Sequence, residues 1–143
     1  MIRAYHRHED PIAEAFRPRI PPGVYDAICY KTEIGTKWGR RAIYVLFRIH
    51  GGDHQGIELF MQCNFPKLKL NLNHKYYHQW MVAYGGPPQK GQRMARKVFL
   101  GKMYRVLVRD SNRKYPDGTQ MPYYTRYSVV ERIVETLTGI PQI

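Results

Sequence analysis

Aromatic and cationic side chains alternate with aliphatic ones along two segments of the chain, with the two-residue period of a β-strand. In residues 42–49 one set of alternate positions is wholly apolar: Ile43, Val45, Phe47 and Ile49. The set between them is Ala42, Tyr44, Leu46 and Arg48. Residues 57–64 show the same alternation, with Ile57, Leu59, Met61 and Cys63 on one face and Glu58, Phe60, Gln62 and Asn64 on the other. Rings and cations on a non-core face can stack on bases and neutralise phosphates, so the pattern indicates oligonucleotide chemistry.

The overall charge agrees with an anionic partner. Lys and Arg outnumber Asp and Glu by 23 to 11 in 143 residues, for a net charge of +12, and such a field attracts polyanions. The cations are spread through strand and loop segments and do not line an amphipathic helix, so we expect no membrane partner. No apolar run is long enough to span a bilayer and the first ten residues lack the apolar core of a signal peptide, so we expect a cytoplasmic protein.

Catalytic and metal-binding patterns are weak. His74 and His78 have the spacing of a helical metal pair, but no third ligand accompanies them, and surface histidines are the better interpretation. Carboxylates are few and scattered, and no glycine-rich phosphate loop is present. Cys29 and Cys63 are too few for a disulfide scaffold and are predicted to be core residues in a reducing compartment. We therefore expect no enzyme activity, no metal and no cofactor.

The elements that must position these side chains follow from periodicity and turn residues. Three strands are predicted at 23–34, 40–50 and 56–65, with glycine-containing links at 35–40 and 51–56. From Asn73 onward, aromatic residues spaced three and four apart predict a helix that stops at Gly85. A short helical turn at 93–100, a strand at 103–110, a loop at 111–121 and a last strand from 123 to about 134 complete the chain. A proline-rich arm, residues 1–22, precedes them, with one helical turn at 13–16.

Three strands, a helix and two more strands form the order of the five-stranded Greek-key barrel known as the OB-fold. With this order, its Pro22-Gly23-Val24-Tyr25 opening and its Gly101-Lys102 before the fourth strand, the chain resembles OB-fold single-stranded-DNA-binding proteins of the type carried by phages and mobile elements. The resemblance implies a mainly β fold with one or two helices, the main helix lying between strands three and four. It assigns residues 23–138 to the nucleic-acid-binding domain and 139–143 to a C-terminal tail. That tail is apolar, unlike the acidic tail of the housekeeping bacterial proteins.

In such a barrel the oligonucleotide lies on strands two and three, between the one-two and four-five loops. The face residues implied are Tyr44, Arg48, Phe60, Gln62 and Asn64. The first loop contributes Lys37, Trp38, Arg40 and Arg41, and the second contributes Arg113, Lys114, Tyr115, Tyr123, Tyr124 and Arg126. Lys67 and Lys69 extend the cationic path beyond strand three. The alternative is that the N-terminal arm buries Tyr44 and Phe60 while the loop cations are merely solvated.

The function expected from the residues and the resemblance is binding of single-stranded DNA with little sequence preference, in replication or recombination of a phage or mobile element. A replication or recombination protein is a further expected partner. Two alternatives stay open. One is an RNA-binding OB-fold module, and the other is a basic interaction subunit whose tyrosine-rich face docks a protein of a replication or conjugation assembly. Composition leaves the oligomeric state undetermined.

Overall fold

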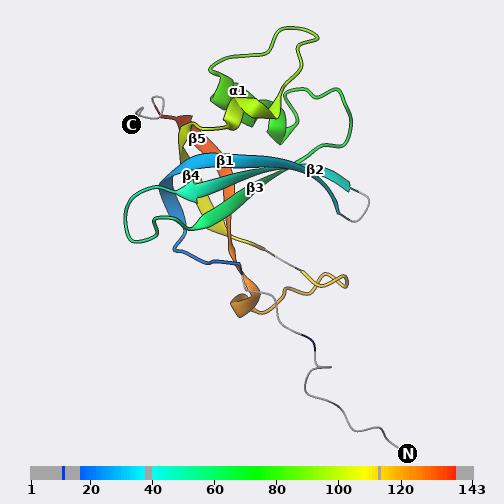
Figure 1. Cartoon of the computed structure of the whole chain (residues 1–143). Helices are drawn as coiled ribbons and strands as arrows, with labels where there is room; N and C mark the ends of the chain where they lie inside the picture. The colour runs from blue at the N-terminus through cyan, green and yellow to red at the C-terminus, as the bar shows by residue number, and fades with distance from the viewer. Residues whose placement is uncertain (1–10, 12–16, 38–39, 113, 138–143) are drawn as a thin grey trace, which may run out of the picture.

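In the part of the chain that the structure describes, five antiparallel strands form one sheet, and one α-helix packs against one end of it (Figure 1). The structure is a computed structural model that describes residues 11, 17–37, 40–112 and 114–137, with the side chain of Lys37 outside this description. Its elements are β1 (Gly23–Lys37), β2 (Arg40–Ile49), β3 (Glu58–Asn64), α1 (Lys75–Tyr84), η2 (Arg96–Phe99), β4 (Met103–Asp110), η3 (Tyr123–Thr125) and β5 (Ser128–Thr136). The predicted mainly β fold is confirmed, as is the position of the helix between strands three and four.

The strand order is β3-β2-β1-β4-β5, and the long strand β1 joins the two halves of the sheet. Residues 23–28 of β1 pair with β4, and residues 27–37 pair with β2 across a register shift between Cys29 and Lys31. A strand shared in this way bends the sheet. The edge strands β3 and β5 approach one another with Cα atoms within 8 Å, but no ladder of hydrogen bonds joins them in the described residues. The sheet is curled but not closed, so the barrel itself stays a prediction.

The inner face of the sheet carries the apolar positions that alternation predicted. All four members of the β2 set are buried, as are Leu59, Met61 and Cys63 of β3, while Ile57 is half-buried at the edge of the core. Cys29 of β1 is also buried, and both cysteines are free thiols. The prediction that both belong to the core is therefore confirmed.

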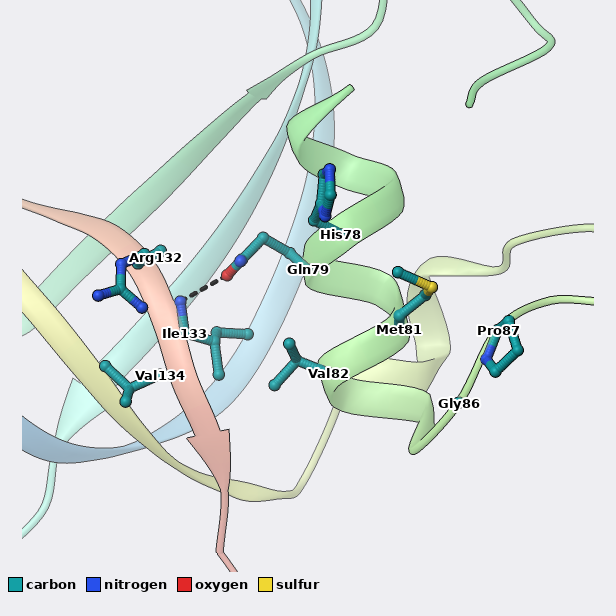
Figure 2. A pocket seen from close by; sticks show the side chains of 9 residues that line it. All are labelled: His78, Gln79, Met81, Val82, Gly86, Pro87, Arg132, Ile133 and Val134. Carbon is teal, nitrogen blue, oxygen red and sulfur yellow. Dashed lines mark hydrogen bonds between the residues drawn. The ribbon is translucent and has the colours of Figure 1, made fainter. Parts of the chain in front are cut away.

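Helix α1 is joined to the sheet by its buried face. Trp80 is 2% exposed, and its indole N–H donates to the carbonyl of Ala95 at 3.2 Å. Gln79 is buried too, and its side-chain oxygen accepts the backbone N–H of Ile133 in β5 (Figure 2). The helix ends as predicted at Gly85, which takes a φ of 93° and donates its N–H to Met81 at 2.8 Å.

Two predicted boundaries are wrong. The last strand begins at Ser128 and not at residue 123, because the carbonyl of Pro122 accepts both the N–H and the hydroxyl of Thr125 and so turns residues 123–125 into η3. The first hairpin is longer than expected, since residues 35–37 continue β1. The predicted turn at 93–100 is present as the 3₁₀ helix η2. The turn expected at 13–16 lies outside the described residues.

Candidate nucleic-acid interface

An aromatic pair lies on the outer face of β2 and β3. Tyr44 and Phe60 are both half-buried, with ring centroids 5.8 Å apart in an edge-to-face arrangement. Gly35 of β1 makes room for this pair, because a Cβ at that position would lie 2.8 Å from Cε2 of Tyr44. The absence of a side chain at Gly35 therefore sets how closely the tyrosine ring can approach the sheet.

Tyr127 extends the pair into a row of three rings. It immediately precedes β5, and its ring centroid is 6.2 Å from that of Phe60 at an interplanar angle of 35°. The guanidinium of Arg17 lies over both rings, 5.0 Å from the centroid of Phe60 and 4.8 Å from that of Tyr127. We call Tyr44, Phe60 and Tyr127 the aromatic row. It connects the two edge strands of the curled sheet.

Sequence reasoning missed two members of this arrangement. Tyr127 was passed over although it follows Tyr123, Tyr124 and Arg126, and that run of aromatic and cationic residues was the available signal. Arg17 had no local signal, because its contacts are with residues far along the chain. The alternative that the N-terminal arm covers Phe60 holds in part, since Arg17 lies against one face of the ring.

Arg48 interacts with other residues of the protein. The sequence-based expectation was different, namely that Arg48 is free to bind a phosphate. Its guanidinium forms an ion pair with Glu58 at 3.0 Å and lies 4.5 Å from the ring centroid of Tyr30. The hydroxyl of Tyr30 donates to the other oxygen of Glu58 at 2.8 Å. The hydrogen bonds from Tyr30 and Arg48 lower the pKa of Glu58, while burial and Glu58 raise the pKa of Tyr30 to about 12. Arg48 therefore contributes less net charge to this face than a free cation.

The polar end of the outer face is exposed. Gln62 lies opposite Tyr44 in the ladder and Asn64 opposite Ala42, and the Gln62 amide donates to Asn64 at 3.4 Å. Arg40 and Arg41 at the start of β2 are also exposed, and the guanidinium of Arg41 lies 5.1 Å from the ring centroid of Phe65. Gln62, Asn64 and Arg40 continue the outer face beyond the aromatic row, whereas Arg41 has the strand parity of the inner set and lies over Phe65.

The loop between β4 and β5 adds a second set of rings and cations. Tyr123 and Tyr124 are 68% and 69% exposed, with centroids 6.1 Å apart. Lys114 and Tyr115 are exposed as well. In Figure 1 this loop and the β1–β2 hairpin both project on the right of the sheet.

The base of this loop is held by an ion pair. Arg19 bonds both oxygens of Asp110, at 2.9 and 3.1 Å, which lowers the pKa of Asp110. The Nε of Arg126, also in the loop, is buried and has no hydrogen-bond partner in the described residues. A buried donor without an acceptor costs free energy in the folded state.

The predicted loop and segment cations differ from Arg48 in forming no ion pair with a described carboxylate. Among the described residues, six carboxylates form ion pairs, namely Asp26, Glu33, Glu58, Asp110, Glu131 and Glu135. None of these ion pairs includes Arg40, Arg41, Lys67, Lys69, Lys114 or Arg126. Arg126 nevertheless interacts electrostatically with Asp110 and contributes to its lowered pKa, whereas the charges of the other five cations stay available to an external anion. Trp38, Arg113 and the side chain of Lys37 lie outside the described residues.

Other kinds of site have no comparable geometry in the described part of the chain. No group of three or more His, Cys, Asp or Glu side chains is placed to hold a metal ion there. His74 accepts the N–H of Asn71 at 3.0 Å and His78 contacts the carbonyl of Leu72, so both interact with the chain that enters α1. A hollow of about 610 Å³ between α1 and β5 is shown in Figure 2; of the groups lining it, His78 and Arg132 are ionisable.

The chain matches no protein-family model, and a search of curated proteins finds no match either. Within the described ranges, no helix has the length and apolar character needed to cross a membrane. The case for function therefore depends on the geometry of the outer face.

Proposed function

We propose that this protein binds single-stranded DNA with little sequence preference, using the outer face of β2 and β3. The observation that carries the proposal is the aromatic row, which is flanked by cations that form no ion pair in the described residues. Base stacking on an aromatic ring is worth about 1–3 kcal/mol, and any base has a face that can stack. The strand order is also the one that an OB-fold barrel requires, and such a barrel is part of the proposal.

In the free protein, a side chain of the same chain, that of Arg17, lies on two rings of the aromatic row. Arg17 lies over Phe60 and Tyr127, so a base that stacks on their exposed side must displace its guanidinium. A cation–π contact at an exposed site is worth about 0.5–1 kcal/mol, so the two contacts of Arg17 together are comparable to one stacked base, which contributes about 1–3 kcal/mol. The released guanidinium then remains near the strand, where it can pair with a phosphate.

Single strands suit this face better than duplex. In a duplex the base faces are stacked on one another, whereas an unpaired base can rotate onto a protein ring. Gln62 and Asn64 offer hydrogen bonds to base edges, but flexible exposed amides discriminate weakly between bases. The proposal involves no chemical step. With the resemblance to phage and mobile-element proteins, it assigns the protein to replication or recombination.

The test is a fluorescence anisotropy titration with labelled oligothymidylate, oligouridylate and duplex DNA at two salt concentrations. We expect tight binding of oligothymidylate, weaker binding of duplex, and log K falling with log salt by about 0.7 per phosphate neutralised. Equal affinity for duplex, or a flat salt response, contradicts the proposal. Tighter binding of oligouridylate supports the RNA alternative instead, and no binding of any nucleic acid supports the interaction-subunit alternative.

A further inference from the structure

A second hollow, of about 780 Å³, lies at the α1 end of the sheet. It is lined by Ile34 of β1 and Ile43 of β2, by the segment after β3, by helix α1 and by residues 88–96. In Figure 1, α1 and the loops beside it lie above the sheet, and the β4–β5 loop lies below it. We call this hollow the α1 groove. It shares Lys69, but none of the aromatic row, with the proposed nucleic-acid interface.

The α1 groove exposes aliphatic surface. Ile34 is 47% exposed and Leu68 is 71% exposed, and Leu70 and Phe65 line the groove beside them. Tyr77 adds a half-buried ring from the helix. Clustered apolar side chains that line a concave surface and face water are typical of interaction sites.

The charge of the groove has one sign. Lys69, Lys90, Arg93 and Arg96 line it, and no carboxylate does. None of the four forms an ion pair with a described residue. Arg96 is held in place by its contacts at 3.4 Å with the carbonyl and hydroxyl oxygens of Thr32. A ligand that fits this groove is therefore apolar and anionic at once.

The wall formed by residues 88–96 is fixed before any ligand arrives. The hydroxyl of Tyr76 donates to the carbonyl of Met94 at 2.7 Å, and Trp80 donates to the next carbonyl, that of Ala95. Gln89 and Gln92 close a turn with two hydrogen bonds of 2.8 and 2.9 Å. A preformed groove does not have to be ordered at the moment of binding, which favours affinity.

We propose that the α1 groove binds an acidic segment of a partner protein, in which Asp or Glu residues flank bulky apolar side chains. The charge complementarity is with carboxylates, and the aliphatic lining suits Leu, Ile or Phe side chains. A nucleic acid is less suitable, because the exposed side chains Ile34 and Leu68 have no π-face for a base, and the rings in the lining, Phe65, Tyr76 and Tyr77, are buried or half-buried. A second copy of the chain is also less suitable, because each copy carries a net charge of +12.

The experiment selects a random peptide library on the full-length protein and measures enriched peptides by fluorescence anisotropy. We expect enrichment of acidic peptides with bulky apolar residues. The groove variants Leu68→Ser and Arg93→Glu should each weaken binding by about tenfold or more, the loss typical of an interface anchor. The matched controls Leu100→Ser and Lys97→Glu change exposed residues that do not line the groove and should leave affinity unchanged.

Three outcomes overturn the inference. One is the absence of enrichment, or enrichment of peptides that bind the groove variants as well as the parent. Another is loss of oligothymidylate affinity in the groove variants by a similar factor, which assigns the groove to the nucleic-acid path. The third is a dimer of the parent in sedimentation that Leu68→Ser dissociates, which makes the groove a self-association surface. The peptide measurement involves no oligonucleotide. It therefore tests peptide binding by the α1 groove independently of single-stranded-DNA binding by the outer face.

Discussion

Phe60→Ala removes the central ring of the aromatic row, and the structure separates its effect on stability from its effect on binding. The ring is half-buried and contacts Tyr44, Tyr127 and Arg17 on the outer face. Each ring pair is worth about 0.5–1.5 kcal/mol and an exposed cation–π contact about 0.5–1 kcal/mol. We expect a loss of about 1–2 kcal/mol of unfolding free energy, below the additive sum because the neighbouring rings can close up. Core aromatic deletions cost more, about 3–5 kcal/mol.

Phe60→Ala should also weaken the affinity for single-stranded DNA relative to the parent protein. Removing a stacking ring costs about 1–3 kcal/mol, which corresponds to a Kd about 5- to 150-fold weaker. The two quantities are measured in parallel, by urea unfolding of the free protein and by anisotropy of labelled oligothymidylate. Affinity is measured where both proteins are fully folded, so that a change in stability does not alter the apparent Kd.

Tyr84→Ala is the matched control for this experiment. Tyr84 is 51% exposed at the end of α1, where it stacks on Trp80 at 4.3 Å, and it belongs to neither proposed site. Its truncation should leave oligonucleotide affinity unchanged. If Phe60→Ala destabilises the protein while affinity stays at the parental value, the aromatic row is a packing feature and the proposed interface is misplaced.

Four further results are expected. Trp38→Ala should weaken single-strand affinity by about 1–3 kcal/mol in the same titration while leaving the melting temperature unchanged, and the reverse outcome makes Trp38 a packing residue. Trp80→Ala should lower the unfolding free energy by about 3–5 kcal/mol in urea, because this side chain is 2% exposed; a smaller effect contradicts its role in the core. Burial raises the pKa of Cys29 and of Cys63 to about 11, so a thiol reagent near neutral pH should react with them only after unfolding, and rapid native labelling counts against the packing described. Burial lowers the pKa of Lys75 below 10.5, so the unfolded state binds more protons between the two pKa values and stability should rise with pH there. Lys75→Met should raise the unfolding free energy measured with urea at neutral pH and should remove its increase with pH. If the increase with pH persists in Lys75→Met, another group causes it.

Local patterns in the chain determined much of the fold. The inward and outward faces of β2 and β3 follow from alternation, because successive side chains of a strand must point to opposite sides of the sheet. The end of α1 at Gly85 follows from the conformational freedom of glycine at a left-handed position. The residues after Pro122 were harder to predict. The β-propensity of the tyrosines favours a strand, but the hydrogen bonds from Thr125 to the carbonyl of Pro122 favour a turn, and the structure has the turn.

For a site, the amino-acid pattern alone predicts the kinds of side chain available, namely rings, amides and cations on a non-core face, in a chain with a net charge of +12. Which of these side chains lie together follows from the three-dimensional fold. It paired Arg48 with Glu58 and brought Arg17, Phe60 and Tyr127 into contact, while Lys114 of the β4–β5 loop forms no ion pair among the described residues. It also gathered aliphatic and cationic residues from four segments into the α1 groove. These contacts join residues far apart in the chain, and they depend on how the bent strand β1 curls the sheet, which no local pattern encodes.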